Sequence, residues 1–328
     1  MKTVLLTGAN GFLGGHLCRE LLARGYGVRA FVRPQGDNRV LNGLPVDVWP
    51  GDLREIDNVR AATYGCDYVI HAGALAQVNP ARSRTVVDTN IGGTAAVLAA
   101  AIQADVERLV FVGTANVFGF GTKDKPGDET SPYMGEPYGL DYMDSKKAAT
   151  NLVLQAVRAD KVPAVLVHPT FMIGPLDYKI TSNALLLALH RRQVAGIPAG
   201  GKNYIHVADA AVATVNALTM GTIGESYILG NENLSYDEFF SLVAEIAKVK
   251  KPAYTIPPLI TSIIGRLSEW QGRTLGVRSQ LNVAMAMVAN DSHYFNVSKA
   301  VNTLKLPQTP IRIAIQQAFD WFRQQGYV

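Results

Sequence analysis

Two hydrophobic patterns alternate along the first two-thirds of the chain. Short runs that are nearly continuous in valine, leucine and isoleucine are typical of strands buried on both faces. Between them, apolar residues recur at the helical spacing of three and four positions. The pattern predicts strands within 2–8, 28–32, 46–53, 67–73, 108–114 and 163–169, and helices within 11–25, 54–65, 85–104 and 142–158. This alternation predicts an α/β protein built on a doubly wound parallel sheet.

The rhythm changes after about Gly174. Helical patterns then dominate, and the short strand-like runs 204–206 and 226–230 lie among them. We predict helices within 183–192, 207–220, 235–249, 258–272, 278–290 and 311–327. The chain is therefore expected to form a first domain over 1–174 and a smaller, mostly helical region over 175–328 packed on it. Segments around 203–230 are expected to return to the first domain.

Composition narrows the class of protein. The 328 residues are 48% hydrophobic and 18% charged, with a net charge of +4 that suits an anionic ligand. No basic stripe with interleaved aromatic residues is present, so we expect no nucleic-acid partner. The six histidines show no paired spacing and no nucleophile elbow is found, which argues against a metal site and against a hydrolase.

The cysteines and the apolar runs indicate the compartment in which the protein is expected. Cys18 and Cys66 have no metal spacing and are expected to be free, mostly buried thiols of a reducing compartment. We find no apolar run of the roughly 18 to 20 residues that a membrane span needs. The N-terminal run is too short for a signal peptide and continues into a glycine-rich turn, so we interpret it as a first strand. The protein is expected to be cytoplasmic and not membrane-bound.

The sequence TGANGFLG places Gly8, Gly11 and Gly14 between the first strand and the first helix. Glycine allows a tight turn and lets a pyrophosphate approach the backbone. The helix N-terminus then directs free N–H groups and the positive end of its dipole at that phosphate. The turn therefore predicts a dinucleotide site in a Rossmann-type sheet.

The glycine spacing resembles that of the extended short-chain dehydrogenases/reductases, which include NAD-dependent epimerases and dehydratases. Four further segments occur in the order found there: GDL at 51–53, HAGA at 71–74, NIGGT at 90–94 and FVGTANVFG at 111–119. The segment HPTFMIGP at 168–175 is similar to the strand end that follows. The resemblance covers essentially the whole chain. It implies that the cofactor is bound by Gly8, Asn10, Gly11, Phe12, Leu13, Gly14, Asp52, Leu53, Ala72, Gly73, Ala74 and Pro169.

The segment YMDSK falls where this superfamily carries its Tyr-x-x-x-Lys motif. Tyr142 and Lys146 share one helical face, so both can reach one site. A nearby ammonium would lower the pKa of the tyrosine, and Tyr142 could then exchange a proton with a carbonyl or alcohol oxygen. The resemblance implies that Thr114 is the catalytic Ser/Thr, and that Lys146 and Tyr142 also contact the cofactor.

The choice of cofactor depends on the end of the second strand. An acidic residue there binds the ribose 2′-hydroxyl of NAD, and a basic residue suits the 2′-phosphate of NADP. Val32 is followed by Arg33, and the nearest acid is Asp37 beyond a proline and a glycine. We therefore favour NADP, with NAD as the alternative.

Three functions share this machinery. The first is a reductase or dehydrogenase acting on a small carbonyl or alcohol substrate, similar to dihydroflavonol reductases. The second is a nucleotide-sugar epimerase or dehydratase, as in the hopanoid-associated putative sugar epimerases, whose C-terminal segment this chain also resembles. Lys202-Asn203 stands where such enzymes often carry Arg-Asp, which weakens that interpretation. The third is a non-catalytic NADP-binding sensor. A homodimer is possible, because members of the superfamily often pair through the helix that carries the Tyr-Lys motif.

Overall fold

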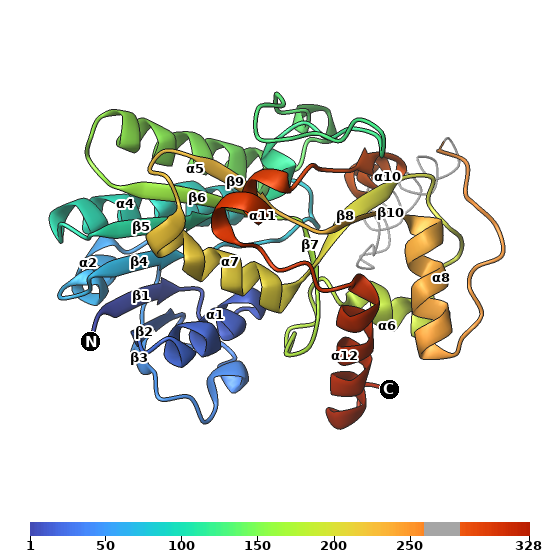
Figure 1. Ribbon diagram of the computed structural model, residues 1–328, viewed down its shortest axis with the longest axis horizontal. Helices are drawn as coiled ribbons and strands as arrows, with labels where there is room; N and C mark the ends of the chain where they lie inside the picture. The colour runs from blue at the N-terminus through green and yellow to red at the C-terminus, as the bar shows by residue number, and fades with distance from the viewer. Residues whose placement is uncertain (259–282) are drawn as a thin grey trace.

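Seven parallel strands form the larger sheet of the computed structural model, which describes residues 1–258 and 283–328 (Figure 1). The strands are β1 (Thr3–Thr7), β2 (Gly27–Val32), β3 (Asp47–Pro50), β4 (Tyr68–His71), β5 (Arg108–Val112), β6 (Ala164–Pro169) and β9 (Ser226–Leu229). Their order across the sheet is β3-β2-β1-β4-β5-β6-β9. The predicted doubly wound α/β fold is confirmed, and the order reverses between β1 and β4, where such sheets bind ligands.

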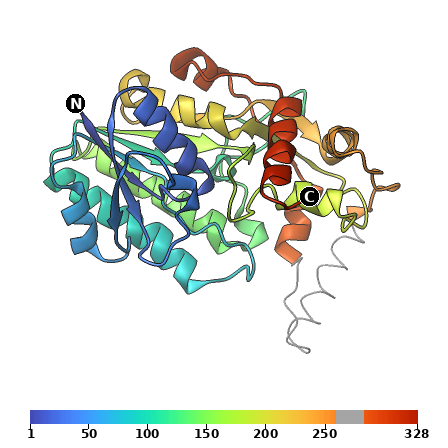
Figure 2. The ribbon, with the colours of Figure 1, turned by 90° about the horizontal axis from the view of Figure 1, so that it is seen from below.

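Helices cover both faces of this sheet, which explains why its strands are apolar on both sides (Figure 2). One face packs against α1 (Phe12–Ala23), α7 (Val207–Met220) and α11 (Ser298–Leu304). The other packs against α2 (Ile56–Thr63), α4 (Gly93–Gln103) and α5 (Asp141–Arg158). The two buried layers hold the carboxyl ends of the strands in fixed relation to one another.

The helical stretch Arg84–Gln103 bears on the question of a membrane span. It consists of α3 (Arg84–Val87), a π-helical segment η2 (Asp88–Gly92) and α4. With 20 residues and a mean hydropathy of 1.4, it meets the length and composition of a membrane span. Half of it is buried inside the molecule, as expected of a core helix that packs on a sheet.

A smaller sheet and several helices make up the C-terminal region (Figure 1). Its strands are β7 (Phe171–Ile173), β8 (Gly201–His206), β10 (Glu232–Ser235) and β11 (Ser292–His293). The helices are α6 (Ala184–His190), α8 (Tyr236–Ala247), α10 (Val283–Asn290) and α12 (Ile311–Gln324). The region is mostly helical, as predicted. Of the small sheet only the run 204–206 at the end of β8 was predicted, because the other three strands have two to four residues and carry little periodicity.

The segment around 203–230 divides between the two parts of the molecule. Strand β8 joins the smaller sheet, while α7 and β9 pack against or extend the larger one. We propose, as the sequence suggested, that 1–174 and 175–328 act as cofactor and substrate regions.

The predicted helix 258–272 and the start of 278–290 lie outside the described residues. Cys18 and Cys66 are free and buried, as predicted.

Candidate active site

The glycine-rich turn lies at the reversal point between β1 and β4. Gly8 has φ of +71°, a conformation that side chains disfavour, and a Cβ there would lie 2.8 Å from the backbone of Gly73. A Cβ on Gly14 would lie 2.1 Å from the carbonyl oxygen of Gly8. By contrast, a Cβ on Gly11 would meet only that oxygen, at 3.1 Å. Gly8 and Gly14 therefore shape the turn, and Gly11 keeps its outer side clear.

The first turn of α1 fits an anion. Its N-cap, Gly11, has no side-chain cap, and no acidic residue lies in the first turn. The first N–H that bonds backward is that of Gly15, to the carbonyl oxygen of Gly11 at 3.0 Å. The preceding N–H groups, of Phe12, Leu13 and Gly14, have no partner within the helix. Free N–H groups beside a cleared glycine turn are what a dinucleotide pyrophosphate requires.

Asn10 and Asp52 lie at the edges of this turn. The Asn10 amide donates to Asn38 Oδ1 at 2.8 Å, which ties the turn to the loop after β2. Asp52 holds Arg54, with 2.6 Å between a carboxylate oxygen and a guanidinium nitrogen. Leu53 approaches Gly73 so closely that a Cβ there would lie 2.8 Å from Leu53 Cδ1. The turn, GDL and HAGA segments are thus brought together.

Asn90 connects the segment after β4 to the helix that carries the Tyr-Lys pair. Its Oδ1 accepts from the N–H of Leu75 at 2.8 Å, and its amide donates to the hydroxyl of Ser145 at 3.0 Å. The Ser145 hydroxyl in turn donates to the carbonyl oxygen of Tyr142 at 3.1 Å. Asn90 was recognised only as part of a motif, because its partners are distant in sequence. It holds Ala72, Gly73 and Ala74 against α5.

Tyr142 and Thr114 meet through their side chains. Tyr142 lies in the first turn of α5, and Thr114 follows β5 as the cap of the turn η3 (Ala115–Val117). Burial raises the pKa of Tyr142, and the hydrogen bond with the Thr114 side chain opposes that shift. The prediction that an ammonium would lower the tyrosine pKa is therefore wrong for this structure. The phenol is protonated at neutral pH, as an ordinary tyrosine is.

Lys146 lies one turn further along the same face. Its ammonium donates to the carbonyl oxygen of Val112 at 2.7 Å and lies 4.5 Å from the centre of the Phe111 ring. This position explains why it does not act on the Tyr142 pKa. Burial lowers the pKa of Lys146 to about 7. The lysine is therefore held at the carboxyl end of β5, beside Thr114.

The buried Lys146 predicts a pH dependence of stability. The folded chain releases this proton at about pH 7, whereas an unfolded lysine keeps it to about pH 10.4. Because the unfolded state binds more protons between these values, the free energy of unfolding should rise with pH in that window. We expect Lys146→Met to show a smaller rise between pH 7 and pH 9 in urea unfolding.

The matched control is Lys147→Met, one position along α5 at a partly exposed site. Its pH profile should follow that of the wild type. Equal slopes for wild type and Lys146→Met would contradict the buried position of the Lys146 ammonium.

Arg33 lies exposed directly after β2. Within the described parts of the chain, no side chain makes a hydrogen bond to its guanidinium. Asp37, the nearest acid, is instead bound by Arg39 at 2.7 Å, which lowers the Asp37 pKa. Burial lowers the pKa of Lys179, and the positive charge of Arg33 lowers it further, while the charges of Asp37 and Asp177 oppose the shift. The sequence around Arg33 could not indicate Lys179, because Lys179 belongs to the loop that follows β7, far along the chain.

Two buried histidines, His71 and His168, lie near the carboxyl ends of β4 and β6. His71 Nδ1 lies 2.7 Å from the Thr7 hydroxyl, and Nε2 lies 3.1 Å from the Thr94 hydroxyl. His168 Nε2 lies 3.3 Å from the Ser226 hydroxyl. Both rings are thus held by side chains. Pro169, next to His168, ends β6 in a buried position.

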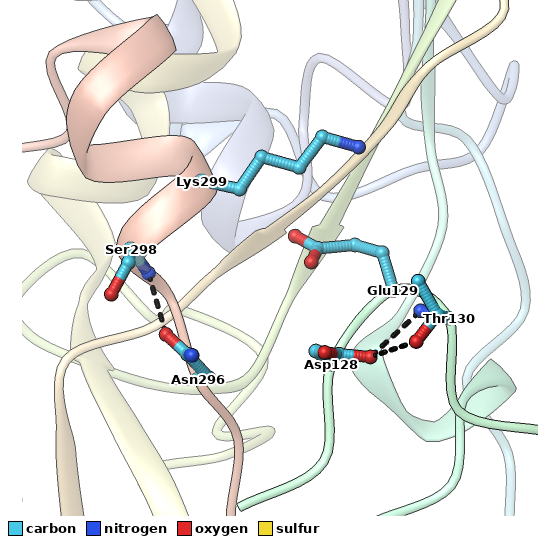
Figure 3. Close-up of a pocket in the computed structure, with 6 residues that line it drawn as sticks. All are labelled: Asp128, Glu129, Thr130, Asn296, Ser298 and Lys299. Atoms are coloured by element: carbon cyan, nitrogen blue, oxygen red, sulfur yellow. Dashed lines mark hydrogen bonds between the residues drawn. The ribbon is translucent and has the colours of Figure 1, made fainter.

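A separate hollow of about 270 Å³ is lined by Asp128, Glu129, Thr130, Asn296, Ser298 and Lys299 (Figure 3). None of these was a predicted site residue. Asp128 accepts hydrogen bonds from Thr130, and Lys299 forms an ion pair with Glu225. None of the residues of the glycine turn, nor Thr114, Tyr142 or Lys146, lines this hollow. Among the described residues, no cluster of three or more metal-ligating side chains occurs.

Comparison with known proteins supports this geometry. A family model described as the NAD dependent epimerase/dehydratase family matches residues 4–230. A putative dihydroflavonol 4-reductase of Synechocystis sp. is 31% identical over 328 aligned residues, which cover 98% of this chain and 95% of that protein. Both matches include the glycine turn and the Tyr-Lys segment.

Two solved structures are similar over nearly their whole length. The crystal structure of gox2253 matches with a TM-score of 0.88 and 31% identity, covering 100% of both chains. A nucleoside-diphosphate-sugar epimerase from Pseudomonas aeruginosa matches with a TM-score of 0.82 and 25% identity, covering 99% of both chains.

Proposed function

The chain belongs to the NAD-dependent epimerase/dehydratase family, as its ordered motifs predicted, and within it we propose an NADPH-dependent carbonyl reductase. The observation that carries the proposal is the arrangement of Thr114, Tyr142 and Lys146 at the carboxyl end of β5, where the Tyr142 hydroxyl meets the Thr114 side chain and the Lys146 ammonium is held by Val112. A phenol in this position can give its proton to a carbonyl oxygen that gains negative charge as hydride arrives. The likeness to a putative dihydroflavonol 4-reductase supports this choice.

Each residue of the site has a proposed role. The reduced nicotinamide, when bound, supplies the hydride. Tyr142 donates a proton to the carbonyl oxygen of the substrate, and the Thr114 hydroxyl holds that oxygen by a second hydrogen bond. Lys146 binds the ribose hydroxyls on the nicotinamide side. The N–H groups of the first turn of α1 bind the pyrophosphate, and Asn90 keeps the cofactor-lining segment against α5.

Apolar side chains surround the tyrosine. Tyr142 packs against a buried cluster of Tyr138, Leu140, Met143 and Ala284. Phe120 and Met287 pack against the same cluster. We propose that this surface receives the apolar body of a small carbonyl substrate.

The expected location of the protein is the cytoplasm, and the expected assembly is a homodimer through α4 and α5.

The proposal is tested by mixing purified protein with NADPH and a panel of aldehydes and ketones. Loss of absorbance at the reduced-nicotinamide band that depends on the carbonyl compound is expected. Tight NADPH binding with no oxidation by any carbonyl compound would contradict the reductase.

A nucleotide-sugar epimerase is the second candidate, because the likeness to the Pseudomonas aeruginosa epimerase extends over the whole chain. In that case the cofactor would be reduced and reoxidised within each turnover. Incubation with UDP-hexoses would then give the epimer without a net change in absorbance, and chromatography of the sugar product distinguishes the two activities.

Cofactor choice is tested by Arg33→Ala. We propose that Arg33 binds the 2′-phosphate of NADP and that Lys179 adds a second positive charge beside it. The variant should lose about 10-fold or more of its NADPH affinity, since a hydrogen bond between charged groups is lost, and little of its NADH affinity. Fluorescence titration with both cofactors measures this difference. Arg60→Ala, an exposed arginine on α2, is the control, and an equal loss for both cofactors would exclude the role of Arg33.

A further inference from the structure

His168 is a fully buried histidine to which the proposed reaction assigns no role. It lies near the carboxyl end of β6, next to Pro169, and is 0% exposed. Its Nε2 lies 3.3 Å from the hydroxyl oxygen of Ser226 on β9. Its Nδ1 has no hydrogen-bond partner among the described residues. A buried polar atom without a partner is costly, so the position of this ring calls for an explanation.

The ring lies against Gly113, the residue between β5 and Thr114. A Cβ on Gly113 would lie 2.2 Å from Nδ1 and 2.6 Å from Cε1 of His168. The N–H of Gly113 also donates to the carbonyl oxygen of Val167 at 2.7 Å, which binds the end of β5 to β6. The imidazole therefore fills the space that a side chain at position 113 would need, and the backbone there cannot move toward it.

The same ring contacts the other end of the turn that carries Thr114. Phe118 follows η3 and is buried. Its ring lies 4.8 Å from that of His168 between centroids, with 74° between the two planes. One side chain from β6 thus packs against the residues before and after the turn 114–117.

Three successive backbone positions at the end of β5 are each contacted by a different side chain. Lys146 donates to the carbonyl oxygen of Val112, and His168 packs on Gly113. The side chain of Thr114 forms a hydrogen bond with the proposed proton donor. The first and third contacts come from α5, whereas the second comes from β6. His168 therefore fixes this segment from a separate element of the fold.

The charge state of the ring excludes a role as a cation. Burial lowers the pKa of His168 to about 3, the charge of Lys146 lowers it further, and the backbone of Thr114 opposes the shift. The imidazole is therefore neutral at neutral pH. A neutral ring lies beside the Lys146 ammonium without repelling it, so His168 contributes through its shape and position.

We propose that His168 is a positioning residue, whose ring holds the turn between Gly113 and Phe118 so that the Thr114 hydroxyl is aligned with Tyr142 for the reaction. The inference rests on the proposed function of Thr114 and Tyr142. His168 acts through this turn, since its own ring is fully buried.

The test asks whether His168 and Thr114 act together. His168→Leu removes both ring nitrogens, and His168→Asn serves where the leucine variant does not fold. Each is made in the wild-type and in the Thr114→Val protein. In the wild type, kcat for carbonyl reduction should fall about 10-fold or more, because a small misplacement of a reacting group is costly, while NADPH affinity is unchanged. In Thr114→Val, kcat should fall little further, because the hydroxyl that the ring positions is already gone.

His190→Leu is the matched control. His190 ends α6, and its Nδ1 likewise has no hydrogen-bond partner in the described part of the chain. Its ring packs 5.9 Å from that of Phe319, away from the proposed site. This variant should keep the kcat of its parent in both backgrounds. An equal loss from His168→Leu or His168→Asn in both backgrounds would overturn the inference, and so would a folded variant with normal kcat.

Amide hydrogen exchange across residues 112–118 provides a measurement that does not depend on turnover. The His168 variants should exchange faster there than the wild type and His190→Leu, because the turn loses the ring that it packs against. A wild type that reduces no carbonyl compound would contradict the reductase proposal alone. Unchanged exchange across 112–118 would overturn the positioning role of His168 whatever the reaction.

Discussion

Tyr142→Phe is expected to lower kcat for carbonyl reduction by about 10²- to 10⁴-fold, the usual contribution of a positioned proton donor. Phenylalanine keeps the ring that packs against the cluster around Met143, so the fold should be preserved. It removes only the hydroxyl that Thr114 contacts and that burial keeps protonated. NADPH affinity, measured by fluorescence titration, should therefore stay close to that of the wild type while stopped-flow NADPH oxidation falls.

Tyr133→Phe provides the matched control. The Tyr133 hydroxyl donates to the carboxylate of Asp144 at 2.7 Å, and Asp144 lies on α5, the helix that carries Tyr142. This variant therefore also loses a tyrosine hydrogen bond next to α5. Its turnover should stay near that of the wild type. A Tyr142→Phe protein with normal turnover would exclude Tyr142 as the proton donor. A parallel loss of NADPH affinity would instead show that the tyrosine acts by positioning the cofactor.

Local sequence patterns predicted the larger sheet well, for a physical reason. Parallel strands covered on both faces must be continuous in apolar residues, and the helices between them must carry an apolar stripe. The glycine turn was predictable on similar grounds, because Gly8 and Gly14 occupy positions where a Cβ would strike the backbone. Such constraints act within a few neighbouring residues, and they can therefore be recognised in one sequence.

The features that the sequence did not predict depend on contacts between distant residues. Asn90 bonds to Leu75 and Ser145, and neither partner could be inferred from its spacing. The pKa of Tyr142 moved opposite to the prediction because the side chain is buried, while the ammonium of Lys146, although at the expected i+4 position, donates to Val112. Spacing along a helix gives the face that a residue occupies, but not the atom that it contacts.

Gly14→Ala should destabilise the protein by about 1 to 3 kcal/mol, the cost of forcing an extra methyl group into a filled space. The new Cβ would lie 2.1 Å from Gly8 O and 2.8 Å from two backbone atoms of Ala9, and none of these can rotate away. The turn between β1 and α1 would have to shift, and the N–H groups at the start of α1 would shift with it. We therefore expect weaker NADPH binding together with a lower free energy of unfolding, both measured on the same purified variant.

Gly92→Ala makes the same change in a helical glycine whose added Cβ would meet nothing within 4 Å. Since alanine is the better helix former, this variant should gain up to about 1 kcal/mol in urea unfolding and keep its NADPH affinity. The opposite signs of the two variants would separate the packing role of Gly14 from the general effect of glycine on helix stability. If both substitutions stabilised the protein and left NADPH binding intact, the tight approach of α1 to the turn could not be what shapes the cofactor site. The dinucleotide would then have to be held mainly by contacts outside the first turn of α1.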